Sequence, residues 1–238
     1  MNQGNRLVIP FIVIAALSVG ACSMLNPSQP DRKQATEEKA RNVNGDVWAT
    51  QNQIDATMVS MNNLMSADGP QLQQAYERYS SDVDRLKKQS AVVAADGEYL
   101  NKQSDTYLAD WHKQSNDIND SSLRANSEQD RKTLRDRFTT TQDSYDRAAA
   151  AMSRLIGNFE DIRTALRNDL TARGVQGIAQ AGVVKNAEEN AKQAKDGLNE
   201  VRSQSTALAE ALSPAAQPVA ATNNSSNASG TSSQGSSK

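Results

Sequence analysis

Apolar side chains recur along much of the chain at alternating steps of four and three residues, the spacing of helices that pack as a coiled coil. The longest such run is Leu72, Tyr76, Tyr79, Val83, Leu86, Ser90, Val93, Gly97, Leu100, Ser104, Tyr107, Trp111, Gln114 and Ile118. The second run is Leu134, Phe138, Thr141, Tyr145, Ala148, Met152, Leu155, Phe159, Ile162 and Leu166. The third run is Val184, Ala187, Ala191, Ala194, Leu198, Val201, Ser205, Leu208 and Leu212. A weaker series precedes them: Val43, Val47, Ile54, Met58, Met61 and Met65. This period predicts long helices with left-handed supercoiled packing.

Three clusters of turn-forming residues separate these runs, at 66–70, 119–122 and 173–177. The first ends in a proline suited to a first helical position, the second offers capping side chains, and the third supplies a glycine C-cap. The second cluster has no glycine or proline, so the helices on either side of it could also be continuous. We expect four helices, over 32–66, 70–118, 121–172 and 177–212. Because short connections make consecutive helices antiparallel, the predicted fold class is all-α, an elongated antiparallel helical bundle of coiled-coil type over residues 31–212.

The expected helices are unequal in length, so the two central ones should project past the others as a stalk. Small or polar residues interrupt the longest stripe at Ser90, Gly97, Ser104 and Gln114. They either face large side chains of a neighbouring helix and fix its register, or leave a groove for a ligand. We favour the first interpretation, because large aromatic side chains ordinarily pack opposite such gaps. The stripes could be satisfied within one chain or between two, so an oligomer also fits the pattern.

Proline is nearly confined to the two ends of the chain, and only Pro70 lies between residues 31 and 213. Because proline breaks helices, this distribution permits long ones. Residues 213–238 are rich in serine and asparagine and have few apolar side chains, so we expect a disordered C-terminal tail. The final Lys238 is similar to the residue that joins the major outer-membrane lipoprotein to peptidoglycan. The residues before it do not match that protein, and we assign Lys238 no role.

The N-terminal segment has the layout of an export signal. Met1–Arg6 is polar, and Leu7–Leu17 is an apolar stretch. As a helix this stretch would span about 16 Å, which is too short to cross a bilayer and right for a signal peptide. The residues that follow resemble the bacterial lipobox: Val19, Gly20, Ala21 and Cys22.

By this resemblance, residues 1–21 are a lipoprotein signal peptide, Cys22 is lipidated after cleavage, and residues 22–30 form a short tether. Ser23, where aspartate would favour retention at the inner membrane, favours export to the outer membrane. We therefore expect a protein of the bacterial cell envelope that is lipid-anchored in the outer membrane on its periplasmic face. The alternative is an ordinary secreted protein in which the cysteine is accidental.

Composition argues against several classes of function. The chain has 26 basic and 28 acidic side chains, so it lacks the basic excess that binding to nucleic acid requires. One cysteine and one histidine exclude an internal disulfide and make a metal site built from such ligands improbable. Gly174 and Gly177 are not followed by the residues of a phosphate-binding loop, and no Gly-x-Ser-x-Gly nucleophile motif occurs. His112 has no suitable partner at helical spacing, so we expect no catalytic residue, metal or cofactor.

Residues 60 to 208, in round numbers, are similar to a bacterial family named domain of unknown function 2959. The resemblance is carried by the helix after Asp68-Gly69, by the Trp111 region that leads into residues 119–124, and by residues 168–173. It implies a helical, coiled-coil envelope protein, often a lipoprotein, and brings no catalytic residues.

Together these features predict a structural or scaffold lipoprotein that is held by membrane lipid through Cys22. Its expected partner is an envelope protein or peptidoglycan. The alternative is an adaptor that binds and regulates an envelope protein complex. We do not expect an enzyme.

Overall fold

The structure is a computed structural model that describes residues 29–213. Five helices make up this part of the chain, in which there is no strand: α1 (Gln29–Met65), α2 (Gln71–Asn116), α3 (Ser121–Asn168), α4 (Ala172–Gln180) and α5 (Val183–Leu212). The all-α prediction is therefore confirmed. The expected signal peptide, Cys22 and nearly all of the expected tail lie outside the described residues.

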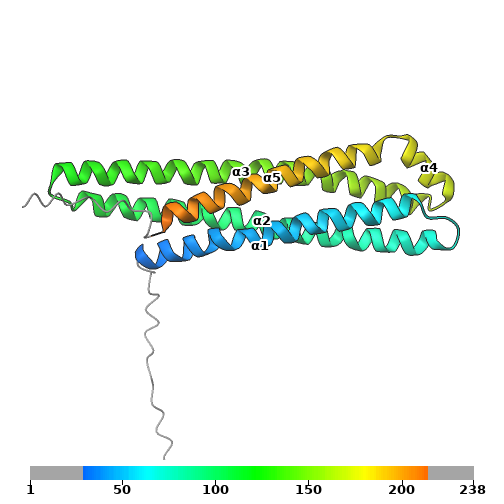
Figure 1. Cartoon of the computed structure of the whole chain (residues 1–238), viewed down its shortest axis with the longest axis horizontal. Coiled ribbons are helices and arrows are strands. Elements are labelled where there is room, and N and C mark those ends of the chain that lie inside the picture. The colour runs from blue at the N-terminus through cyan, green and yellow to red at the C-terminus, as the bar shows by residue number, and fades with distance from the viewer. Residues whose placement is uncertain (1–28, 214–238) are drawn as a thin grey trace, which may run out of the picture.

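The four long helices form an elongated antiparallel bundle in which each lies beside two others (Figure 1). α2 lies between α1 and α3, and α5 returns along α3 to pack against α1. The contact between α1 and α5 includes the Gln51 side-chain amide, which donates to the Lys195 carbonyl at 3.2 Å and to Asn199 Oδ1 at 3.0 Å. The short helix α4 covers the end of the bundle where α3 turns into α5.

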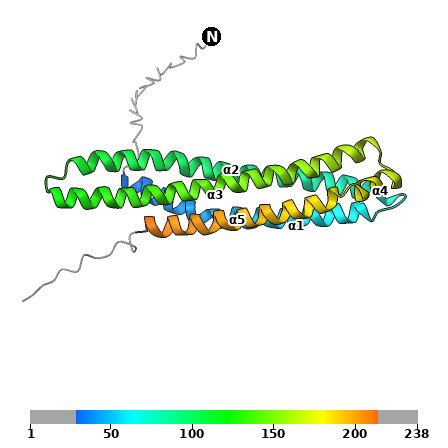
Figure 2. The ribbon, with the colours of Figure 1, turned by 90° about the horizontal axis from the view of Figure 1, so that it is seen from above.

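At the other end, α2 and α3 continue past α1 and α5 as a two-helix stalk (Figures 1 and 2). The guanidinium of Arg32, near the start of α1, lies 3.7 Å from the Asp110 carboxylate, which marks the level at which α1 begins. Beyond that level α2 and α3 pair with each other, and Trp111 Nε1 donates to Ser127 Oγ at 2.9 Å. The predicted stalk is therefore present. α2 and α3 are separate helices, because Asp120 caps α3 and accepts from the backbone amides of Ser122 and Leu123.

The core is made by the predicted stripes, which face one another inside the single chain. Every member of the second run, from Leu134 to Leu166, is buried. Where α2 and α3 meet, the Tyr79 ring stands edge-on to Phe159 with centroids 6.2 Å apart, and its hydroxyl donates to the Phe159 carbonyl at 2.8 Å. Aromatic pairs prefer this geometry, so the contact fixes the register of the two longest helices.

The predicted stripe of α1 needs a correction. Its buried positions include Thr50, Thr57 and Leu64, whereas Met58 and Met65 lie at the edge of the core. The two threonines can be buried because each hydroxyl donates to a carbonyl four residues earlier in α1, at 2.8 and 2.7 Å. These hydrogen bonds remove the penalty for burying a polar group. A stripe drawn through apolar residues alone passes over both threonines and includes Met58 and Met65 instead.

The expected fourth helix, 177–212, is also wrong in its boundaries. α3 ends at Asn168, and Thr171 caps α4 by accepting from the Gly174 amide at 3.2 Å. Gly174 lies inside α4, where a Cβ atom would come within 2.1 Å of the Asp169 carbonyl oxygen. The glycine that breaks the chain is Gly182, whose φ of 70° is left-handed and favours glycine. The presence of glycines at 174 and 177 therefore does not locate this turn.

Candidate functional site

None of the predicted site residues falls in the described part of the chain. The expected lipidation site is Cys22, and the expected cleavage motif is Val19, Gly20 and Ala21; all four precede residue 29. The remaining candidates are features of the bundle itself. Three of them are described below: a cleft, a buried ion pair and a group of polar side chains near the tip of the stalk.

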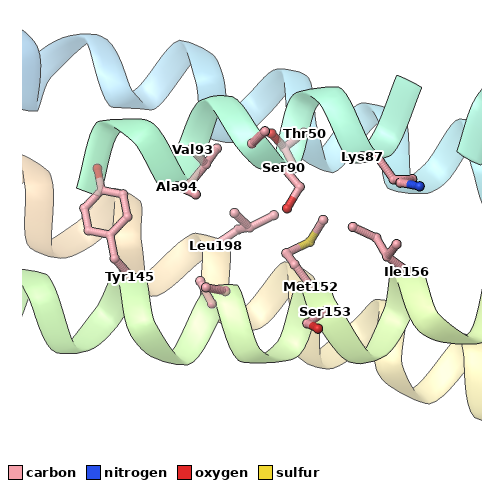
Figure 3. A pocket seen from close by; sticks show the side chains of 13 residues that line it. Thr50, Lys87, Ser90, Val93, Ala94, Tyr145, Met152, Ser153, Ile156 and Leu198 are labelled. Atoms are coloured by element: carbon pink, nitrogen blue, oxygen red, sulfur yellow. The ribbon is translucent and has the colours of Figure 1, made fainter. Parts of the chain in front are cut away.

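An apolar cleft of about 330 Å³ lies between α2 and α3, midway along the bundle (Figure 3). Ser90, Met152 and Leu198 point toward one another from α2, α3 and α5, with Leu198 at the floor. Tyr145 lies at one end of the cleft, and Lys87 lies at the other. The volume is at the lower limit of the range for pockets that bind small molecules.

The cleft exists because two interruptions of the α2 stripe, Gly97 and Ser90, have different neighbours on α3. At Gly97 the Tyr145 ring packs so closely that a Cβ atom would lie 2.8 Å from its Cδ1. This is the structural role expected for such a gap. One heptad earlier, Ser90 meets no comparable aromatic ring, and the neighbouring Ala94 and Ala149 are also small. The space beside Ser90 therefore stays open, as the groove interpretation requires.

The remaining interruptions of this stripe, Ser104 and Gln114, are neither filled by a ring nor part of the cleft. Ser104 is buried, and its hydroxyl donates to the Asn101 carbonyl of its own helix at 2.8 Å. Gln114 is exposed, and Ser115 takes its place in the core of the stalk. The stripe therefore shifts by one residue near the end of α2.

A ladder of charges runs beside the cleft along the junction of α2 and α3. The Lys87 ammonium lies 2.9 Å from Glu160 Oε1. Glu160 also pairs with Arg163 at 2.5 Å, and Arg163 pairs with Asp84 at 2.7 Å. With each charge matched, the mouth of the cleft offers little net attraction to an ionic ligand. Ser90 also has no histidine near it, because the only histidine of the chain is in the stalk. The mostly apolar lining of the cleft suits an apolar group.

The second candidate is an ion pair on the junction of α1 and α2. The Asp96 side chain is buried, with 3 % of the residue exposed, and pairs with the Lys39 ammonium. Its other oxygen, Oδ2, has no hydrogen-bond partner among the described residues. Burial raises the pKa of Asp96, the Lys39 ammonium opposes this shift, and the nearby Asp46 carboxylate adds to it. The sequence carries a signal for this site, because Asp82 and Asp96 each precede a stripe residue and are two heptads apart. Both side chains are buried in the structure.

The third candidate is the tip of the stalk, where polar side chains connect α2 and α3. His112 Nδ1 lies 3.1 Å from Glu128 Oε1, and Arg131 lies 2.6 Å from the other oxygen of Glu128. Hydrogen bonds from Arg131 and then from His112 lower the pKa of Glu128 to about 2. His112 is thus an exposed histidine that connects two helices. The arrangement holds the two helices together.

Among residues 29–213, no group of three or more His, Cys, Asp or Glu side chains could hold a metal ion. None of the described helices is both long enough and apolar enough to cross a membrane.

Comparison with known proteins gives a family without an assigned activity. No curated protein and no solved structure gives a significant match to the chain. One family model matches residues 33–211, which is nearly the whole of the five-helix bundle, and its description is "Protein of unknown function (DUF2959)". A match over this share of the sequence confirms the suspected resemblance, and the chain belongs to the DUF2959 family.

Proposed function

We propose that this protein is a lipid-anchored lipoprotein of the bacterial envelope, facing the periplasm, in which the helical bundle acts as a rigid scaffold. The observation that carries the proposal is the short distance in sequence between the lipobox-like segment and the bundle. α1 begins at Gln29, seven residues after Cys22. An acylated Cys22 would therefore tie the whole bundle closely to a membrane.

The shape of the bundle supports a scaffold role. α3 has 48 residues, which corresponds to about 70 Å of continuous helix. The long helices are held in register by buried contacts such as Tyr79 with Phe159, so the rod resists bending. A stiff rod attached at one end keeps its far end at a fixed distance from the membrane.

Replacement of the cysteine tests the anchor. Cells that express the full chain with Cys22→Ala should incorporate no labelled palmitate into the protein, and the protein should leave the membrane fraction. Ser28→Ala is the matched control, because it changes the same segment outside the lipobox and should keep both properties. Retained labelling and membrane association in the Cys22→Ala chain would refute the anchor. Ser23→Asp should keep the label and move the protein to the inner membrane.

An adaptor role is the second candidate, and the cleft beside Ser90 favours it. A partner protein could insert an apolar side chain there, since the bundle itself leaves the space open. Photo-crosslinkers at Ala91 and Ala149, which are exposed at the edges of the cleft, test this role. Capture of one stoichiometric protein partner supports the adaptor. Capture of peptidoglycan alone supports the scaffold.

A further inference from the structure

Three features of the bundle meet at one of its ends. α1 begins there, α5 ends there, and the stalk of α2 and α3 projects beyond both (Figures 1 and 2). The opposite end holds the turn between α1 and α2 and the short helix α4. If Cys22 is acylated, the stalk therefore projects from the end of the rod that is connected to the lipid.

The lengths involved allow the stalk to reach that lipid. α1 begins near the level of Asp110, and the stalk turns around at residues 117–120, so it extends roughly 10–15 Å beyond the start of α1. The seven residue steps from Cys22 to Gln29 can span at most about 25 Å. An anchored Cys22 can therefore lie level with the tip of the stalk or beyond it.

The tip presents an apolar side chain on a rigid support. Leu123, in the first turn of α3, is 60 % exposed. The Asp120 carboxylate accepts from the Leu123 amide at 2.9 Å, which caps the helix. The Arg124 guanidinium donates to the carbonyl oxygens of Ile118 at 3.0 Å and Asn119 at 3.3 Å, which closes the turn. These bonds fix the backbone of the turn and of the first turn of α3, where Leu123 is exposed close to the end of the stalk.

The charges around Leu123 suit the headgroup region of a membrane. Lys113 has a long cationic side chain, 78 % exposed, that can keep its charge among lipid phosphates while its methylene groups lie beside apolar chains. Arg124, Asp117 and Asp120 leave the tip without a net positive charge, so insertion of Leu123 rather than net charge would drive the contact. A single leucine contributes a modest affinity, which is enough to orient a rod that is already anchored.

We propose that the tip of the stalk rests on the same lipid surface that holds Cys22, with Leu123 inserted between headgroups, so that the rod stands on its stalk. α4 and the turn between α1 and α2 then lie at the end away from the membrane. This inference rests on the proposed lipid anchor. It adds the orientation of the bundle and a second point of contact with lipid.

The test is photo-crosslinking in cells with the full chain and a benzophenone amino acid at position 123. The matched control has the same probe at Val59, which is 57 % exposed on α1, far from the stalk. We expect phospholipid adducts of the chain labelled at 123, identified by mass spectrometry, and at least tenfold fewer from the probe at 59. Both positions are on the surface, so neither probe should disturb the core.

Three results would overturn the inference. They are adducts at 123 with protein or peptidoglycan but not lipid, equal lipid labelling at both positions, and lipid labelling at 59 alone. Palmitate labelling of the same two chains distinguishes failure of this inference from failure of the proposed lipid anchor at Cys22. A chain without palmitate refutes the anchor itself, whereas a palmitoylated chain without lipid adducts at 123 refutes only the upright orientation.

Discussion

The close approach of Tyr145 to Gly97 makes a strong prediction about a single methyl group. In Gly97→Ala the new Cβ would lie 2.8 Å from Cδ1, 2.9 Å from Cγ and 3.2 Å from Cβ of Tyr145. Rotation about χ2 leaves Cγ and Cβ in place, and a change of χ1, which would move Cγ, would take the buried Tyr145 ring out of its packing. α2 and α3 must move apart locally, and overpacking of this kind costs about 1–3 kcal/mol.

An opposing effect must be separated from this one. Alanine is a better helix former than glycine by about 0.8–1.0 kcal/mol, so the substitution also stabilises α2 itself. Gly157→Ala is the matched control, because Gly157 is exposed in the interior of α3 and no atom outside the local helix lies within 4 Å of its added Cβ. We expect Gly157→Ala to raise the free energy of unfolding by about 0.5–1 kcal/mol. Gly97→Ala should leave it unchanged or lower it by up to about 2 kcal/mol.

Urea unfolding followed by far-UV circular dichroism measures the difference, with the chain from residue 23 onward as the reference protein. The two variants should differ by about 1–3 kcal/mol in the free energy of unfolding, with similar slopes. If Gly97→Ala is as stable as Gly157→Ala, the tight contact of α2 with Tyr145 does not exist. The assignment of Gly97 as a packing position would then be wrong.

Three other substitutions test the core and the stalk. Tyr79→Phe removes the hydrogen bond to the Phe159 carbonyl and should lower the free energy of unfolding by about 0.5–1.5 kcal/mol in the same urea assay; no change would contradict a buried bond. Burial raises the pKa of Asp96 in the folded protein above its ordinary value of about 4. Above that pH the folded protein therefore binds more protons at this residue than the unfolded protein does. The stability of the natural chain relative to Asp96→Asn should therefore fall as the pH rises above this value, and a relative stability that rises instead would contradict the shift. Arg131→Met should raise the pKa of Glu128 from about 2 toward its ordinary value, as measured by NMR titration of the carboxyl carbon; an unchanged pKa would exclude the arginine as the main cause. Because that pKa is lowered, the natural chain should lose the corresponding stabilisation as the pH falls from about 4.5 toward 2.

The sequence predicted those parts of the fold in which each stripe position has a large apolar side chain. In α3, residues such as Leu155 and Phe159 leave one possible inward face, and this face is the buried one. The inward face of α1 is less evident from the sequence, because Thr50 and Thr57 become suitable for the core only when their hydroxyls bond to their own helix. Period alone does not contain that information.

The sequence does not predict the turn before α5 or the cleft, because similar residues there differ only in their three-dimensional surroundings. Gly174 and Gly182 look alike in sequence, but the first is required by the nearby Asp169 carbonyl and the second by its left-handed backbone. Likewise, Gly97 and Ser90 occupy equivalent stripe positions one heptad apart. Which of them is filled depends on where Tyr145 falls when α2 and α3 align, and the alignment is a property of the packed bundle.

The return of α5 to the side of α1 has a consequence for how the fold can be encoded. The four long helices form a closed ring, so the first and last of them are neighbours just as consecutive helices are. A circular permutant that links the end of α5 to the start of α1 and opens the chain at Gly69 would keep every neighbouring pair of helices. The order in which the helices are synthesised is therefore separable from the order in which they pack.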